Sequence, residues 1–366
     1  MLIPPFRRSA FISFALASFA IHANAQTNDR LDEFINRYLR DHKIPGCAVM
    51  VRNKGQVLTK GYGIANEEWN TPVTTNTLFQ SGSVGKQFTA LAIMMLVERH
   101  KISLDDPVSK YLYVPKKWAG IQVKHLLSHT SGLGDYPEWI TYQENYDDAD
   151  LLRMITQERL CCRPGEKFEY SNLGYATLGF LIEKGSGEKF YGDFLRSRVF
   201  EPLGMKNTRI ISDSDIIPNR ASGYVLKQKE LKNQEWVSPE FNRTADGTLY
   251  FTADDLAKWA EELEAMKLLR PKSYEEMWTP FKLTDGSRGP YGFGWYVDDS
   301  NPTHPVRWHD GVWQGFSAYI IHFPNDRLTV AVLCNLRDAK SGYMGDHIAE
   351  LFEPGLVSQK SSSSTH

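Results

Sequence analysis

The sequence has no strong excess of charge of either sign and no long apolar run. Its 42 basic and 44 acidic residues leave a formal net charge of -2, and no basic stripe is interleaved with aromatic residues. A nucleic-acid partner is therefore not expected. Beyond residue 25, no apolar segment reaches the roughly 20 residues that span a bilayer. We expect no stable membrane insertion of the mature chain.

Cysteine is scarce, and metal-binding patterns are missing. Of the four cysteines, Cys161 and Cys162 are adjacent, whereas Cys47 and Cys334 lie in apolar, strand-like runs, where buried free thiols are common. Free thiols are the favoured interpretation, and a disulfide between Cys47 and Cys334 stays open if their strands are neighbours. No cysteine and histidine spacing matches a zinc site, so neither a metal nor another cofactor is expected.

The amino terminus has the pattern of a secretory signal peptide. Arg7 and Arg8 precede an apolar run over residues 10–21, and the small-residue sequence Ala-Asn-Ala ends at Ala25. The run has about half the length of a membrane-spanning helix. We expect a signal peptide over residues 1–25, cleavage after Ala25, and a periplasmic or secreted protein. An uncleaved anchor is the alternative.

Segments typical of strands lie towards both ends of the mature chain, with helical patterns between them. Residues 47–53 and 56–66 flank a turn at Lys54 and Gly55, which predicts a hairpin. Helical spacing follows around residues 126, 153, 179 and 196, and over 252–266 with Thr252 as the expected N-cap. Further strand patterns occupy residues 291–297, 316–323 and 327–335, and an amphipathic helix over 343–352 is expected to cover the sheet.

This order predicts an α+β fold, with an antiparallel sheet built from both termini, flanking helices, and an inserted, mostly helical subdomain. The α/β part is expected over residues 26–98 and 245–355, and the helical subdomain over 99–244. The serine-rich tail, residues 356–366, is expected to be disordered.

The segment FQSGSVGKQFTA, residues 79–90, places Ser83 and Lys86 three residues apart at the start of a helix. Gly82 permits a tight bend. Side chains at i and i+3 share one helix face, so the Lys86 amine can reach the Ser83 hydroxyl. Burial favours the neutral amine. Ser83 is thus a candidate nucleophile, with Lys86 as its proton acceptor.

The same spacing also arises by chance, because short motifs have many accidental matches. Ser186 and Lys189 repeat it in KGSGEKF, where the glycines indicate a solvated turn rather than a site. The motif alone therefore does not identify a nucleophile.

Two further motifs distinguish the first pair. FEYSNLGYATLG places Tyr170 and Asn172 on a turn that opens a helix, and no other tyrosine is followed two residues later by asparagine. RWHDGVWQGFSAY places His309 and Gly311 at the end of a short strand. Taken singly, Tyr170 would be a half-buried loop residue and Asn172 a helix cap.

Together these motifs resemble the serine β-lactamase and penicillin-binding-protein superfamily, in the branch of class C β-lactamases, D-alanyl-D-alanine carboxypeptidases, D-aminopeptidases and related esterases. The resemblance covers roughly residues 30–355. IPGCAVMV and KGYGIAN resemble the first hairpin of that family, and SGSVGK resembles the nucleophile motif. HLLSHTSGL, EYSNLGY, TADDLAKW and WHDGVWQGF complete the series in the same order.

The resemblance implies a role for each matching residue. Ser83 would become acylated, while Lys86 and Tyr170 would exchange its proton as base and acid; which of the two holds the proton stays open. Asn172 would orient Lys86 and the substrate amide. The backbone N–H groups of Ser83 and Val312 would form the oxyanion hole.

The third motif departs from the family pattern. Lys-Thr-Gly is typical of the β-lactamases, whereas this chain has His309-Asp310-Gly311, and histidine at the first place occurs in peptidases and esterases of the family. His309 and Gly311 are expected to bind or orient substrate. Asp310 stands where a threonine helps to hold a substrate carboxylate, and its charge would repel such a group. Anionic β-lactams are therefore expected to be less suitable substrates.

Several aromatic residues near these motifs have two interpretations. Trp308 and Trp313, with Tyr136 and Trp139, are candidates for an apolar wall around a larger acyl or leaving group, and ordinary packing is the alternative. His125 and His129 are expected to stabilise the helical subdomain.

The resulting expectation is a secreted serine hydrolase that forms an acyl-enzyme on Ser83. Its substrate would be a small molecule or peptide with an ester or amide bond, D-amino-acid peptides and cell-wall fragments included. Two alternatives stay open: a β-lactamase, and a non-catalytic receptor domain that binds penicillin or cell-wall fragments.

Overall fold

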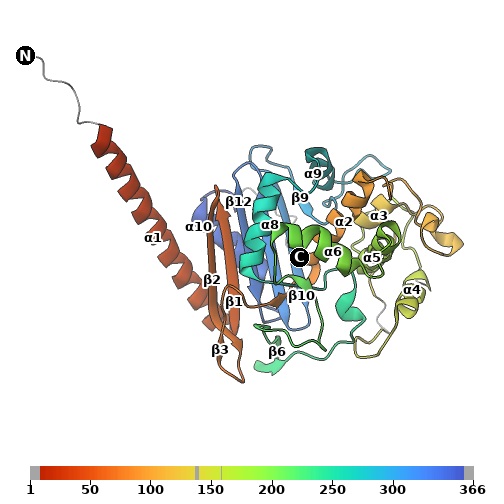
Figure 1. Ribbon diagram of the computed structural model, residues 1–366, viewed down its shortest axis with the longest axis horizontal. Helices are drawn as coiled ribbons and strands as arrows, with labels where there is room; N and C mark the ends of the chain where they lie inside the picture. The colour runs from red at the N-terminus through yellow and green to blue at the C-terminus, as the bar shows by residue number, and fades with distance from the viewer. Residues whose placement is uncertain (1–8, 137–139, 158, 358–366) are drawn as a thin grey trace, which may run out of the picture.

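The computed structural model describes residues 9–136, 140–157 and 159–357. Its centre is a seven-stranded sheet in the order β3-β2-β1-β12-β11-β10-β9 (Figure 1). Every pairing in it is antiparallel, which confirms the predicted sheet built from both termini. The strands are β1 (Gly46–Asn53), β2 (Gln56–Asn66), β3 (Thr71–Pro72), β9 (Tyr296–Asp298), β10 (Val306–Trp313), β11 (Phe316–Phe323) and β12 (Leu328–Cys334).

The pairing of β1 with β12 joins the two ends of the domain and places Cys47 directly opposite Cys334. Both thiols are buried and free, so the favoured interpretation of free core cysteines is confirmed. Burial raises the pKa of the Cys47 thiol well above its ordinary value. The group therefore stays in its protonated, unreactive form.

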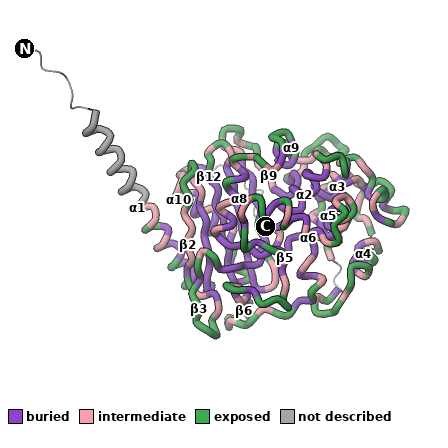
Figure 2. Tube along the Cα trace, viewed as in Figure 1, coloured by how far each residue is buried: buried purple, intermediate pink, exposed green. Residues whose placement is uncertain are grey.

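Helices cover both faces of this sheet, and buried residues fill the space between the layers (Figures 1 and 2). α1 (Ser9–His42) and α10 (Ser341–Phe352) pack on one face, and α2 (Lys86–Glu98) and α8 (Ala253–Ala265) lie on the other. Successive residues of a strand point to opposite faces. Accordingly, Val330 and Val332 join the core under α10, whereas Ala331 and Leu333 join the core under α8. The amphipathic helix predicted over 343–352 does cover the sheet.

The chain between α2 and β8 (Leu249–Phe251) contains several helices joined by long loops. Its helices are α3 (Val123–Leu127), α4 (Asp148–Gln157), α5 (Asn172–Ser186), α6 (Tyr191–Leu195) and α7 (Glu201–Leu203), and α9 (Pro271–Met277) follows α8. The short strands of this region form two small separate sheets. One contains β4 (Phe79–Gln80), β8 and β5 (Arg209–Ile210), and the other pairs β6 (Tyr224–Lys227) with β7 (Glu230–Asn233). Because β8 pairs with β4, the three-stranded sheet holds in place the segment that leads into Ser83.

The strand predicted over residues 291–297 is largely wrong. Only Tyr296–Asp298 forms β9. Gly294 has a φ of +79, outside the range of a regular strand, and a Cβ on it would lie 2.9 Å from the Lys86 carbonyl oxygen. A Cβ on Gly292 would lie 2.1 Å from the Met277 carbonyl oxygen. This segment therefore presses its backbone against α2 and α9 instead of extending the sheet.

The two ends of the chain fall partly outside the described residues. Of the predicted signal peptide, residues 1–8 are not described, and α1 begins at Ser9 and continues past Ala25. Residues 358–366 of the predicted disordered tail are likewise outside the described part. Within the described residues, no helix combines the length and the apolar character needed to cross a membrane.

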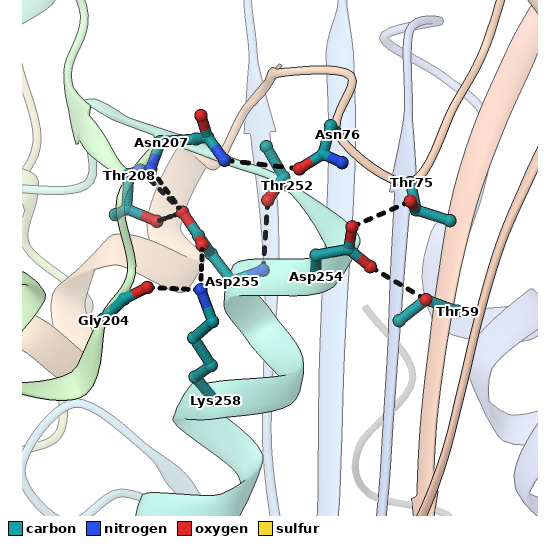
Figure 3. Close-up of polar contacts among 10 residues, drawn as sticks. All are labelled: Thr59, Thr75, Asn76, Gly204, Asn207, Thr208, Thr252, Asp254, Asp255 and Lys258. Atoms are coloured by element: carbon teal, nitrogen blue, oxygen red, sulfur yellow. Dashed lines mark hydrogen bonds and ion pairs between the residues drawn. The ribbon is translucent and has the colours of Figure 1, made fainter.

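Two adjacent aspartates fasten the start of α8 to other elements (Figure 3). Thr252, the predicted N-cap, accepts a hydrogen bond from the Asp255 N–H at 3.0 Å. The buried Asp255 carboxylate accepts the backbone N–H groups of Asn207 and Thr208, each at 2.8 Å. The Asp254 carboxylate turns the other way and accepts two threonine hydroxyls, one on β2 and one after β3. This cluster ties α8 both to the sheet and to the end of the helical region.

Candidate active site

Ser83 lies in a short 3-10 turn, η1 (Gly82–Gly85), between β4 and α2. The predicted helix start is therefore a tighter turn, and the α-helix begins at Lys86. Gly82 has a φ of +49, and a Cβ on it would lie 2.5 Å from the Val312 nitrogen. No other residue fits this place without moving β10.

Strand β10 presses its backbone directly against this turn. A Cβ on Gly311 would lie 2.2 Å from the Ser81 carbonyl oxygen and 2.8 Å from the Ser83 nitrogen. The backbone nitrogens of Ser83 and Val312 thus lie along the same narrow gap between η1 and β10. That gap is where the sequence motifs predict the oxyanion hole.

The Lys86 amine is at the centre of the site. Its Nζ lies 3.0 Å from Ser83 Oγ and 2.6 Å from Asn172 Oδ1, and it also donates to the Asp246 carbonyl oxygen. The amide and carbonyl oxygens are acceptors only. A neutral amine has two N–H groups and one lone pair. These two acceptors use both N–H groups, so the lone pair is left for the Ser83 hydroxyl.

Burial also prepares this amine for proton transfer. Lys86 has no exposed surface, and loss of solvation lowers its pKa to about 8. The negative charges of Asp246, Asp135 and Asp310 act in the opposite direction and limit the fall. About a tenth of the amine is therefore neutral at pH 7, far more than for an exposed lysine, and this neutral form is the one that a general base requires.

Asp135 holds Asn172 in the orientation that Lys86 needs, a role that the sequence motifs do not indicate. Both carboxylate oxygens of Asp135 lie 3.0 Å from Asn172 Nδ2. Because Nδ2 can only donate, this contact turns Oδ1 of the same amide towards Lys86. The signal available in the sequence is the acid that directly follows HTSGLG.

Tyr170 lies beside the amine, with its ring centroid 5.0 Å from Lys86 Nζ. The His129 ring stacks on it at 4.2 Å, and His129 Nδ1 accepts the Ser171 N–H at 3.0 Å. His129 thus supports Tyr170 as well as the helical region.

The Tyr170 hydroxyl holds its proton tightly. Burial raises its pKa well above the ordinary value, and the nearby Ser83 hydroxyl acts in the opposite direction without cancelling this rise. Among the described residues, Tyr170 Oη has no hydrogen-bond partner. The phenol therefore keeps its proton in the resting site.

His309 lies on β10 and is buried. Its Nδ1 is 2.6 Å from the Asp310 carbonyl oxygen and so carries the proton, which leaves Nε2 to accept the Tyr291 hydroxyl at 2.7 Å. Burial lowers the pKa of His309 to about 4. The ring brings no positive charge to the site at neutral pH.

A cavity of about 250 Å³ opens over Ser83 and is walled by Tyr136, Asn172, Asp246, Trp313 and Arg337, among others. Tyr136 and Trp313 therefore contribute to the predicted aromatic wall. Trp308 does not, because it is only 6% exposed and stacks on Tyr296 with ring centroids 4.3 Å apart. Trp139 lies outside the described residues.

The second serine and lysine pair forms no comparable site. Ser186 is the last residue of α5, and Lys189 is exposed in the following turn. The Ser186 hydroxyl donates to the Glu183 carbonyl oxygen within its own helix, at 3.5 Å. Among the described residues, no cluster of three or more histidine, cysteine, aspartate or glutamate side chains is placed to hold a metal.

Comparisons with known proteins identify the family of this chain. A family model for β-lactamases matches residues 31–351. This chain belongs to the β-lactamase family. It is 31% identical over 313 residues to penicillin-binding protein 4* of Bacillus subtilis (strain 168), a match that covers 80% of this chain and 68% of that protein.

Solved structures support the same assignment within the β-lactamase family. The octameric penicillin-binding protein homologue from Pyrococcus abyssi superposes with a TM-score of 0.78 at 28% identity, covering 88% of this chain and 77% of that one. The penicillin binding protein from Bacillus halodurans superposes with a TM-score of 0.76 at 26% identity, covering 87% and 98%. The fold is therefore the β-lactamase and transpeptidase fold, with the neutral His309 where many members have a lysine.

Proposed function

We propose that this β-lactamase-family protein is a serine hydrolase that works through an acyl-enzyme on Ser83. The substrate is an ester or an amide, with D-amino-acid peptides and cell-wall fragments among the candidates. The observation that carries the proposal is the Lys86 amine, which is buried, has a pKa of about 8, and lies 3.0 Å from the Ser83 hydroxyl. A weak nucleophile beside a neutral base is what covalent catalysis requires.

In the first step, Lys86 takes the Ser83 proton as Oγ forms a bond to the substrate carbonyl carbon. Negative charge moves to the carbonyl oxygen, where the N–H groups of Ser83 and Val312 lie beside the gap between η1 and β10. Each such donor contributes about 3 kcal/mol to stabilising the transition state.

In the second step, the bond to the leaving group breaks and the leaving group takes a proton. Tyr170 supplies it, because its phenol is protonated and has no competing partner among the described residues. The Lys86 ammonium then returns its proton to Tyr170. Water repeats the sequence on the acyl-enzyme with Lys86 again as base, and the acid is released.

The charges near Ser83 favour neutral esters and peptides over anionic β-lactams. His309 stands where a family lysine would supply a positive charge, and burial keeps its pKa at about 4. The adjacent Asp310 side chain is 56% exposed and carries a negative charge. A substrate carboxylate at this edge would therefore meet repulsion.

The decisive experiment is turnover of nitrophenyl esters, D-alanyl peptides and a chromogenic cephalosporin by the wild-type protein, Ser83→Ala and Ser186→Ala. Ser186→Ala is the matched control, because it removes the serine of the second pair. We expect ester or peptide hydrolysis to vanish only in Ser83→Ala. Hydrolysis retained by Ser83→Ala would sink the mechanism, and rapid cephalosporin hydrolysis would reverse the substrate preference.

Intact-mass spectrometry separates hydrolysis from simple binding. A hydrolase gives an adduct on Ser83 that decays as substrate is consumed, whereas a receptor domain gives an adduct that persists without turnover. We expect decay.

We also propose export to the periplasm or the medium. The support is the basic and apolar pattern of residues 7–25. Mass measurement of the protein recovered outside the cytoplasm should show an amino terminus at Gln26, and an intact leader on that protein would contradict cleavage.

A further inference from the structure

Three carboxylates surround the reacting groups. The side-chain amide of Asn172 links Asp135 to Lys86. Its Oδ1 lies 2.6 Å from the Lys86 amine, and its Nδ2 lies 3.0 Å from the Asp135 carboxylate. Asp246 is 6% exposed, gives its backbone oxygen to Lys86 and forms part of the cavity wall. Asp310 lies on β10 between His309 and Gly311, with its side chain open to solvent.

The positive charges near Ser83 are too few to neutralise these three carboxylates. Lys86 must give up its charge to act as a base, and His309 is neutral. Arg337 lies on the cavity wall, and the positive charge of its exposed side chain acts to lower the pKa values of Tyr142 and Glu235. When Lys86 is neutral, three carboxylates therefore face one exposed guanidinium.

One of these acids also lacks a partner that would neutralise it locally. Among the described residues, Asp246 Oδ1 is buried without a hydrogen bond, and so is the hydroxyl of Tyr136 on the same wall. Buried charges are screened by solvent and salt much less than exposed ones. Burial accordingly raises the pKa of Asp246 above its ordinary value. A cation that enters the cavity would stabilise the ionised Asp246 carboxylate.

We infer that the site selects substrates that carry a positive charge within a few bonds of the scissile carbonyl, such as the ammonium group of an amino-acid ester or of a peptide with a free amino terminus. This inference rests on the proposed function of Ser83. The positive charge is the feature that distinguishes preferred substrates from esters in general.

The test compares thioesters that differ only in charge. Butyrylthiocholine and its carbon isostere, S-3,3-dimethylbutyl thiobutyrate, place the charge or its neutral equivalent in the leaving group. The ethanethiol esters of betaine and of 3,3-dimethylbutanoic acid place it in the acyl group. Thiol release gives kcat/KM for each. In at least one pair, kcat/KM should be about tenfold higher for the cationic thioester than for the neutral one. This cationic-to-neutral ratio should fall with added salt.

Charge variants show whether the acids named above cause the preference. Asp310→Asn should reduce the cationic-to-neutral ratio of kcat/KM by about threefold. The ratio is compared because the charge of Asp310 also acts on Lys86, so its removal changes the rates of both thioesters together. Asp41→Asn is the matched control, since Asp41 is an exposed acid on α1, which packs on the other face of the sheet. It should leave the ratio unchanged.

The outcomes separate this inference from the proposal on which it rests. If no thioester is hydrolysed and Ser83 takes no adduct, the proposed function fails. If Ser83-dependent hydrolysis shows no cationic preference in either pair, or the preference is the same in Asp310→Asn, only the inference fails. Faster hydrolysis of a succinyl thioester than of the neutral pair would show that Arg337 dominates the site, and would also overturn it.

Discussion

The close approach of β10 to the nucleophile turn makes Gly311→Ala the most informative single substitution. The new Cβ would lie 2.2 Å from the Ser81 carbonyl oxygen and 2.8 Å from the Ser83 nitrogen. Ordinary contact begins at 3.4 Å, so β10 and η1 must separate by about 1 Å at the first contact. Both are backbone atoms, and no flexible side chain can give way.

A displacement of this size separates the two proposed oxyanion donors while leaving the rest of the fold intact. Misplacement by about 1 Å costs about 100-fold in rate, and overpacking of this kind costs about 1–3 kcal/mol of stability. We therefore expect kcat for ester hydrolysis to fall at least about 100-fold, with the protein still folded at room temperature.

The assay measures ester turnover and thermal unfolding on the same preparation. Gly342→Ala is the matched control, because its Cβ would meet Tyr319 at an ordinary 3.6 Å and it lies in α10, away from the site. A folded Gly311→Ala protein that keeps kcat within about threefold of wild type would refute the assignment of an oxyanion hole to this gap.

Three further predictions concern the base, the fold and the thiols. Because Lys86 acts in its neutral form and has a pKa of about 8, kcat/KM for an uncharged ester should rise with pH and level off above that value; a flat profile from pH 6 to 9 would contradict this. Asp255→Ala leaves two backbone N–H groups unpaired, and that of Thr208 is buried, so denaturant unfolding should show a loss of about 2–4 kcal/mol. Alkylation followed by mass spectrometry should label only Cys161 and Cys162 in the native protein and all four cysteines after unfolding; modification of more than two native thiols would show that the β1 and β12 pair is not buried.

Much of the sheet could be predicted because its strands carry local signals. The hairpin of β1 and β2 follows from two apolar runs around a Lys-Gly turn, and α8 follows from its threonine cap. The failure over residues 291–295 has a different cause. Gly292 and Gly294 look like strand glycines locally, but their backbones contact α9 and α2, which are remote in the sequence.

The order and spacing of the motifs were enough to select four site residues together: Ser83, Lys86, Tyr170 and Asn172. Each motif is a short local sequence that contains its own functional residues, so no tertiary information was needed to find it. Only the tertiary structure decided the protonation of the site. The pKa of Lys86 depends on its burial and on three acids brought from separate loops and strands. Solvation and charge–charge distance exist only once the chain is folded. For this reason the sequence motifs did not indicate the roles of Asp135 and Asp246, and only the structure placed Trp308 in the core.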